Sequence, residues 1–167
     1  MTNKQLLEQH NIGDPDNQIE LALDVAETAH IGQQYGKHGD YFSAHIVPVV
    51  IKCAEQNAGC SMLQKKLICA ALHDVLEDTD TIDEEIDALF GADVLATLKL
   101  LTRKKLHRQE YTQYIKSLLV DPIATAVKYA DSTVNLHYCT LDNKEKAALG
   151  VRYKKNLELI DEYRKAL

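Results

Sequence analysis

The most informative stretch of this 167-residue chain is ALHDVLEDT, residues 71–79. It completes an apolar run over 67–76 that only His73 and Asp74 interrupt. A helix that is apolar on all sides is typical of the buried centre of a protein. The run therefore predicts a central buried helix, with Ser61 as its N-cap and Gln64 completing a capping box.

The pair His73-Asp74 needs a partner inside such a helix, because burying an unpaired carboxylate is very costly. No lysine or arginine lies within one helical turn of Asp74, which favours a metal ion. Helical spacing of four residues also places Glu77 and Asp78 on the face of His73 and Asp74. We expect Glu77 and Asp78 to orient and deprotonate a metal-bound water.

Two more helical stretches carry isolated polar residues in apolar surroundings. His45 lies in an apolar segment over 43–56, and Asp131 follows the apolar residues 123–127. Two histidines and two aspartates suit manganese, iron or another first-row ion with open water positions better than a closed zinc site. Asn135, four residues after Asp131, is expected to hydrogen-bond a substrate or the ligand shell.

Each of these residues also has a purely structural interpretation. His45 alone is typical of a satisfied core histidine, and Asp131 alone of a carboxylate that pairs two helices. Glu77 and Asp78 alone are compatible with solvated residues at a helix end. Their occurrence together, in this order and on three predicted core helices, favours the metal site.

The whole chain has the pattern of an all-α protein, since no sustained strand alternation or hairpin signal is present. A polar, glycine-rich loop covers about 33–40. The length of the whole chain suits a single domain over 1–167. The predicted helices cover about 14–32, 43–56, 61–76, 83–90, 94–102, 109–119, 122–138 and 144–167.

Composition restricts the partners. The formal net charge is −6, which argues against DNA or RNA as the main partner but allows a small phosphorylated substrate. No apolar run is long enough to cross a membrane and the first residues lack a signal-peptide core, so a cytoplasmic protein is expected. The four cysteines form no C-x-x-C pair, which argues against a zinc–thiolate site.

The ordered set of a histidine, a His-Asp pair and a later aspartate resembles the signature of the HD superfamily. ALHDVLEDT over 71–79 is further similar to the hydrolase motif of the RelA/SpoT family and its small stand-alone relatives. The same holds for KYAD-x-x-x-N over 128–135 and for AH-x-GQ over 29–33, which precedes a glycine loop and His45. The resemblance covers about 16–140.

This resemblance implies an HD-domain helical bundle, with a motif-bearing body over about 16–140 and a C-terminal helix over about 144–167. It implies one divalent ion held by His45, His73, Asp74 and Asp131. Mn²⁺ is expected from the relatives, with Fe²⁺, Co²⁺, Mg²⁺ or Ni²⁺ as alternatives. The resemblance also implies that Glu77 and Asp78 position and activate the attacking water. It places Asn135 near the substrate.

The implied reaction is hydrolysis of a phosphate or pyrophosphate ester on a nucleotide, with the 3′-pyrophosphate of guanosine tetra- or pentaphosphate, (p)ppGpp, as the leading substrate. A nucleoside 5′-monophosphatase and an NADPH phosphatase are the enzymatic alternatives. A metal-holding nucleotide sensor or interaction module with little turnover is the non-enzymatic one. The sequence leaves open whether the chain forms a homo-oligomer.

The loop before His45 departs from the family pattern R-x-x-G-x-P-Y-x-x-H. Gly36 stands in place of the arginine, Tyr41 in place of the proline and Phe42 in place of the tyrosine. Tyr35 and Lys37 are candidates to supply stacking and charge to the substrate instead.

Basic residues outside the metal set are candidate phosphate contacts. Arg103 and Lys104 belong to the densest positive run of this acidic chain, over 103–108. Arg152 lies next to Tyr153 on the last predicted helix, which resembles a basic–aromatic pair of the small relatives. The run over 103–108 is equally typical of a solvated connector between helices.

Overall fold

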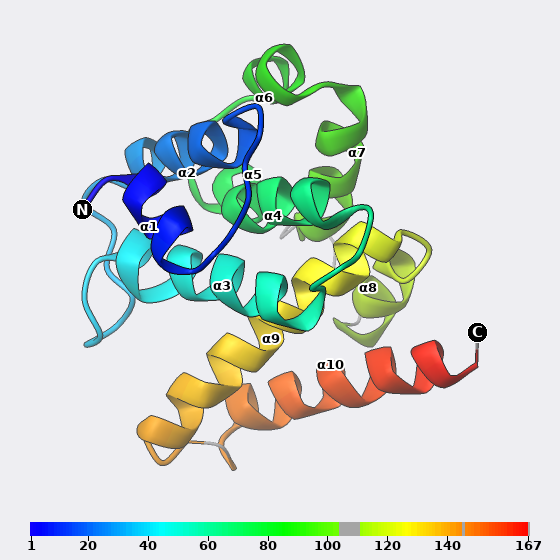
Figure 1. Cartoon of the computed structure of the whole chain (residues 1–167). Coiled ribbons are helices and arrows are strands. Elements are labelled where there is room, and N and C mark those ends of the chain that lie inside the picture. Colours follow the sequence, from blue (N-terminus) through cyan, green and yellow to red (C-terminus); the bar gives the residue numbers. More distant parts are fainter. Residues whose placement is uncertain (104–110, 145, 167) are drawn as a thin grey trace.

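The computed structural model describes residues 1–103, 111–144 and 146–166, in which the regular secondary structure is helical. An isolated β-bridge between Gln34 and Asp40 closes the glycine-rich loop. The predicted all-α fold is thus confirmed (Figure 1). The helical elements are α1 (Asn3–Gln9), α2 (Gln18–Ala29), the π-helical turn η1 (Phe42–Ile46), α3 (Val47–Gln56), α4 (Leu63–Leu72), α5 (Val75–Asp78), α6 (Asp83–Phe90), α7 (Ala92–Leu101), α8 (Tyr111–Leu118), α9 (Pro122–Leu141) and α10 (Ala148–Lys165).

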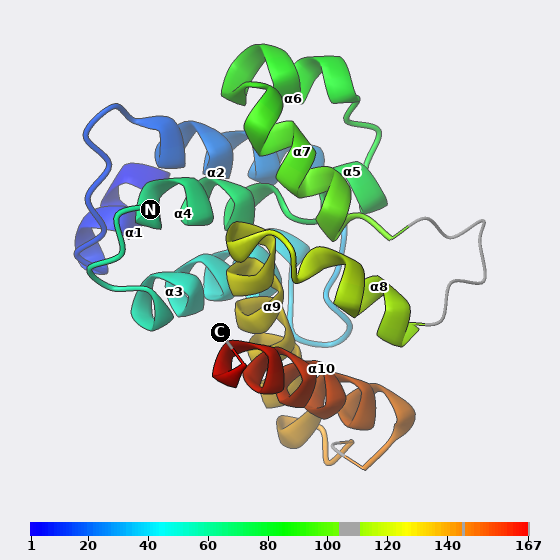
Figure 2. The ribbon, with the colours of Figure 1, turned by 90° about the vertical axis from the view of Figure 1, so that its right-hand side faces the viewer.

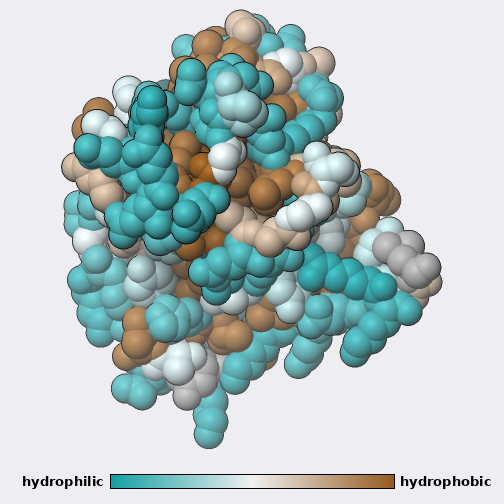
Figure 3. All heavy atoms as spheres, viewed as in Figure 1, coloured by the Kyte–Doolittle hydropathy of each residue, from teal (hydrophilic) through white to brown (hydrophobic). Residues whose placement is uncertain are grey.

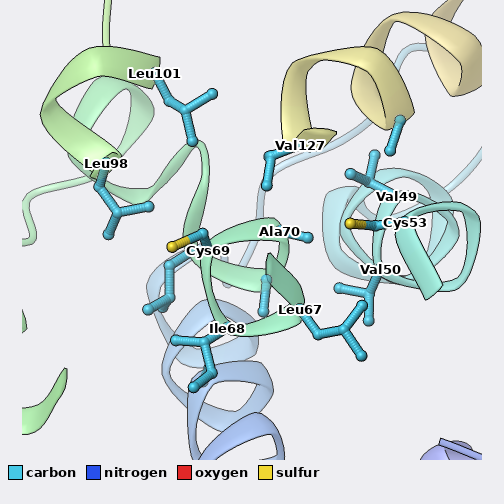
Figure 4. Close-up of a cluster of buried hydrophobic side chains, with 14 of the residues drawn as sticks. Val49, Val50, Cys53, Leu67, Ile68, Cys69, Ala70, Leu98, Leu101 and Val127 are labelled. Carbon is cyan, nitrogen blue, oxygen red and sulfur yellow. The ribbon is translucent and has the colours of Figure 1, made fainter. Parts of the chain in front are cut away.

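Helix α4 forms the centre of the core, as the apolar run predicts. Every residue from 66 to 72 is buried. Figure 4 shows its side chains between α7 on one side and α3 and α9 on the other. The labelled neighbours are Leu98 and Leu101 of α7, Val49, Val50 and Cys53 of α3, and Val127 of α9.

The predicted helix over 61–76 is wrong at both ends. Helix α4 begins at Leu63 without a side-chain cap, and Gln64 contacts Asp16 instead of closing a capping box. It ends at Leu72, because the His73 ring bonds the carbonyl of Ala70 at 2.8 Å. The chain turns there and restarts as α5.

The restart has a clear local cause. The carbonyl of Asp74 accepts hydrogen bonds from the amides of Glu77, at 3.1 Å, and Asp78, at 2.9 Å. These bonds nucleate the short helix α5. His73 and Asp74 therefore lie in a turn between two helices rather than on the face of one helix.

The glycine-rich loop folds back on itself before η1. The amide of Tyr35 donates to the carbonyl of Gly39 at 2.8 Å, and that of Tyr41 donates to the carbonyl of Gln33 at 3.0 Å. Gly36 and Gly39 have φ values of 56° and 119°, which disfavour residues with a side chain. This closed loop places Tyr35 and Tyr41 beside the helix that carries His45.

The π-helical turn η1 precedes Pro48, whose missing N–H cannot donate to an earlier carbonyl. A single π turn inserted before an α-helix is frequent at functional sites. Here it carries His45, which is buried.

Helices α9 and α10 complete the molecule. Asp121 caps α9 by accepting from the amides of Ile123, at 2.7 Å, and Ala124, at 3.0 Å. Helix α10 packs against α9 and crosses it obliquely, as the two perpendicular views show (Figures 1 and 2). The buried Asn156 of α10 donates to Ser132 of α9, at 3.1 Å, and to Tyr111 of α8, at 3.2 Å. This polar contact fixes α8 and α10 on α9.

Hydrophilic side chains cover most of the face seen in Figure 3, and hydrophobic ones show through near its centre. Among the described helices, none combines the length and the apolarity that a membrane crossing requires. All four cysteines are free thiols. Cys53 and Cys69 are buried, whereas Cys60 and Cys139 are partly exposed.

Candidate metal and catalytic site

Three of the four predicted metal ligands meet where η1 approaches the turn between α4 and α5. The Nε2 atoms of His45 and His73 are 3.2 Å apart. Oδ2 of Asp74 lies 3.3 Å from Nε2 of His45 and 3.0 Å from Nε2 of His73. One ligand atom from each residue lies within 4.8 Å of the others, so these side chains can share one ion.

Asp131 of α9 brings the fourth predicted ligand to the same point. Its Oδ1 lies 3.5 Å from Nε2 of His45 and 3.9 Å from Nε2 of His73. Its Oδ2 accepts a 2.8 Å hydrogen bond from Nζ of Lys128. Burial alone lowers the pKa of Lys128, but Asp131 beside it raises that pKa well above its usual range. Lys128 therefore remains charged and pairs with the outer oxygen of Asp131.

The donor set fits a divalent ion. Nδ1 of His73 donates to the Ala70 carbonyl, so Nε2 is the ring nitrogen that faces the cluster and that would bind an ion in place of its proton. Burial lowers the pKa of His73, but the carboxylates of Asp74 and Asp131 outweigh this and raise it to about 9. Burial raises the pKa of the Asp74 carboxyl, but His73 and His45 outweigh this effect and hold that pKa well below its usual range. The cluster thus favours positive charge at its centre, which a metal ion supplies.

Asn135 contacts Asp131, one of the candidate ligands, while its predicted role toward a ligand shell or a substrate stays a prediction. Its Nδ2 donates to the carbonyl of Asp131 at 3.0 Å and also contacts the carboxylate of Asp131. Its Oδ1 accepts a 2.5 Å hydrogen bond from the hydroxyl of Tyr35. The Tyr35 ring stacks on His45 with centroids 4.8 Å apart and planes 10° apart. Tyr35 therefore covers one metal-ligand candidate and reaches a second through Asn135.

Tyr41 is a contact that sequence reasoning missed. Its hydroxyl donates a 2.6 Å hydrogen bond to Oδ2 of Asp74. Burial and the Asp74 carboxylate raise the pKa of Tyr41 well above its usual range, so the phenol keeps its proton. Tyr41 precedes Asp74 by 33 residues, a separation at which no local spacing rule indicates a contact.

An open cavity of about 250 Å³ lies next to this cluster. Glu77 and Asp78 of α5 line this cavity together with the predicted ligands His45, Asp74 and Asp131. The carboxylate of Glu77 accepts a 2.8 Å hydrogen bond from the amide of Arg103, and the carbonyl of Asp78 accepts one from Gln33 at 2.8 Å. The cavity is lined by Tyr35, Tyr41, His45, Asp74, Glu77, Asp78, Arg103, Tyr111, Tyr114, Lys128, Asp131, Asn135, Arg152 and Tyr153.

Cations and tyrosines make up the rest of the lining. The guanidinium of Arg152 lies 4.8 Å from the ring centroid of Tyr111, and that of Arg103 lies 5.7 Å from the same centroid. Sequence reasoning named Arg103 and Arg152 but missed Lys128 as a member of the site. The position of Lys128, three residues before Asp131 on one helix face, was the available signal.

Among the described residues, one predicted substrate contact does not join this lining. Lys37 pairs with Asp142 at 2.7 Å, and its side chain is 72% exposed. Both residues line a neighbouring cavity that shares Tyr35, Asn135 and Tyr153 with the first. A substrate role for Lys37 stays a prediction. Lys104 lies outside the described residues.

Comparison with protein-family models finds no match. Curated proteins do match. The chain is 31% identical over 77% of its length to a guanosine-3′,5′-bis(diphosphate) 3′-pyrophosphohydrolase of Aquifex aeolicus, and 32% identical over 67% to the protein of that name from Vibrio cholerae. It is 28% identical over 79% to the bifunctional (p)ppGpp synthase/hydrolase SpoT of Escherichia coli. The chain spans 16–19% of the length of these relatives.

A solved structure, described as that of a metazoan ortholog of SpoT that hydrolyzes ppGpp, has the same fold. The TM-score is 0.68 at 22% identity, and the match covers 93% of this chain and 99% of the other. Sequence similarity to the pyrophosphohydrolases and the shared helical fold agree with the motifs around His45, His73-Asp74 and Asp131. The chain therefore belongs to the RelA/SpoT-like branch of the HD-domain family.

Proposed function

We propose that this chain is a metal-dependent hydrolase that removes the 3′-pyrophosphate from a (p)ppGpp-type nucleotide. One observation carries the proposal: four side chains suited to a divalent ion converge, and three of them line a cavity that also holds Glu77, Asp78 and several cations. The names of the curated relatives and the solved structure support the choice of substrate.

We propose His45, His73, Asp74 and Asp131 as the ligands of one ion. Two imidazoles and two carboxylates suit Mn²⁺, our first choice, and also Fe²⁺, Co²⁺, Ni²⁺ or Mg²⁺. When bound, the ion supplies a Lewis acid for the phosphoryl oxygen and a water of lowered pKa. Lys128 and Asn135 hold the carboxylate of Asp131 in place for this role.

In this proposal Glu77 and Asp78 accept the proton of the attacking water. The backbone amide of Arg103 holds the Glu77 carboxylate at 2.8 Å, which limits its reorientation. Arg103, Lys128 and Arg152 carry positive charge on the wall of the same cavity. They would offset the negative charge of the phosphate oxygens, which makes this cavity suitable for a nucleotide although the chain is acidic overall.

The experiment is to incubate the purified chain with Mn²⁺ and ppGpp and to measure released pyrophosphate. NADPH and nucleoside 5′-monophosphates, with released phosphate as the readout, complete the panel. We expect pyrophosphate from ppGpp and slower or no release from the others. Faster release from NADPH or from a monophosphate would assign the substrate to that alternative. Metal binding without any product would support a nucleotide sensor instead.

A further inference from the structure

Tyr41 lies at the end of the glycine-rich loop, with its phenol directed at Asp74. Its hydroxyl is 2.6 Å from Oδ2 of Asp74. The same oxygen lies 3.0 Å from Nε2 of His73 and 3.3 Å from Nε2 of His45. Tyr41 therefore contacts the carboxylate oxygen that faces both histidines.

The ring of Tyr41 is held between two histidine rings. It stacks on His30, with centroids 4.8 Å apart and planes 22° apart, and meets the edge of His45 at 5.1 Å. The Tyr41 amide donates to the carbonyl of Gln33 at 3.0 Å, and the Gln33 side chain bonds the His30 ring at 2.8 Å. His30 is 2% exposed, so this support is part of the core. A phenol held in this way offers its hydroxyl in one direction.

The two candidate carboxylate ligands are supported by different chemistry. Asp131 is paired with the ammonium of Lys128, whereas Asp74 accepts from an uncharged phenol. A phenol orients a carboxylate without adding a positive charge that would compete with the ion. A carboxylate oxygen has two lone pairs, so one can accept from Tyr41 while the other faces the histidines.

We propose that Tyr41 is a positioning residue for the metal ion, which it influences through Asp74. Its hydroxyl fixes the carboxylate of Asp74 toward His45 and His73, and metal sites commonly depend on such outer hydrogen bonds for 10- to 100-fold in affinity, roughly. The inference rests on the proposed function insofar as it takes this cluster as the metal site.

The test is isothermal titration of the metal-free full chain with Mn²⁺, without nucleotide, for the wild type and Tyr41→Phe. Phenylalanine keeps the ring against His30 and removes only the hydroxyl. We expect Mn²⁺ to bind Tyr41→Phe about 10-fold more weakly. The matched control is Tyr129→Phe, which removes a 3.3 Å hydroxyl–carboxylate contact from α9 to Asp161 of α10. Its affinity should equal that of the wild type.

A second readout separates positioning from a general structural effect. The electron paramagnetic resonance spectrum of Mn²⁺, recorded at saturation, should change in Tyr41→Phe and not in Tyr129→Phe, because only the first alters the ligand shell. Saturating Mn²⁺ should also restore most of the turnover of Tyr41→Phe. Wild-type affinity together with an unchanged spectrum in Tyr41→Phe would overturn the proposal.

Should Tyr41→Phe fail to fold, the wild type provides the test. The chain has eight tyrosines and no tryptophan, so its near-ultraviolet absorbance reports tyrosine environments. Mn²⁺ binding should perturb this band, and a flat difference spectrum at full occupancy contradicts the proposal.

Loss of affinity in Tyr41→Phe with no ppGpp hydrolysis by the wild type would leave the positioning role standing and remove the proposed substrate. Failure of the wild type to bind any divalent ion overturns both.

Discussion

The Glu77 carboxylate accepts a 2.8 Å hydrogen bond from the backbone amide of Arg103. This bond joins α5, which follows the His73-Asp74 turn, to the segment that follows α7. It holds Glu77 at the cavity that also contains Asp74 and Asp131. Glu77 thus has a fixed place beside the candidate metal ligands without being one of them.

The double substitution Glu77→Gln with Asp78→Asn tests the proton acceptors. Both changes keep the size of the side chain and remove its basicity. We expect kcat for ppGpp to fall by about 100-fold or more, because positioned general bases contribute factors of this order. Bound Mn²⁺, measured by equilibrium dialysis, should stay at the wild-type level. Unchanged turnover in this variant would show that another group accepts the proton.

Lys128→Met tests the buried ion pair with Asp131. The Lys128 side chain is 15% exposed and that of Asp131 is 6% exposed. Removing one partner of a buried pair leaves an uncompensated charge, so we expect the free energy of unfolding of the metal-free chain to fall by about 3 kcal/mol. Urea denaturation measures it. The control Lys52→Met breaks an exposed pair with Glu55 and should cost less than about 1 kcal/mol. Equal effects of the two substitutions would contradict this assignment.

Arg152→Ala tests the cationic wall of the cavity. Its guanidinium lies over the Tyr111 ring at 4.8 Å, at a position where it can meet a phosphate. Loss of one charge-assisted contact should raise KM for ppGpp about 10-fold with a smaller change in kcat. The control is Lys155→Ala, which removes an exposed cation of the same helix and should leave KM unchanged. A KM equal to that of the wild type in Arg152→Ala would remove Arg152 from the substrate site.

The core prediction concerns Leu67, which is fully buried in α4. Leu67→Ala leaves a cavity between α4 and its neighbours, and such changes cost about 2–5 kcal/mol. The exposed Leu149 of α10 provides the control, since Leu149→Ala should change stability by no more than about 0.5 kcal/mol. Chemical denaturation of both variants checks the comparison. A small effect of Leu67→Ala would mean that α4 is not the centre of the core.

The sequence was sufficient for most of the helices, though not for α1 or for the break after Leu72, and for naming the ligand candidates. His45, the pair His73-Asp74 and Asp131 each interrupt an apolar helical run, so burial and the need for a partner could be inferred without a structure. The break after Leu72 could not, because it depends on a hydrogen bond between the His73 ring and a carbonyl of its own helix. The apolar pattern over 67–76 is compatible both with one continuous helix and with two helices joined by a short turn.

The contacts of the glycine-rich loop were also beyond sequence reasoning. Tyr41 meets Asp74, and Lys37 turns away to Asp142, because of how the loop closes between Gln34 and Asp40. Loop closure depends on backbone dihedrals at glycines, which leave no periodic signal. Loop residues could therefore be named as candidates, but their partners could not be assigned.

The decisive measurement is pyrophosphate release from ppGpp as Mn²⁺ is added stepwise to the metal-free chain, with bound ion determined in the same samples. We predict that release is absent in chelator, rises with bound Mn²⁺ and reaches its plateau at one ion per chain. Full occupancy of the site without pyrophosphate release, or equal release in chelator, would contradict the assignment of a metal-dependent pyrophosphohydrolase.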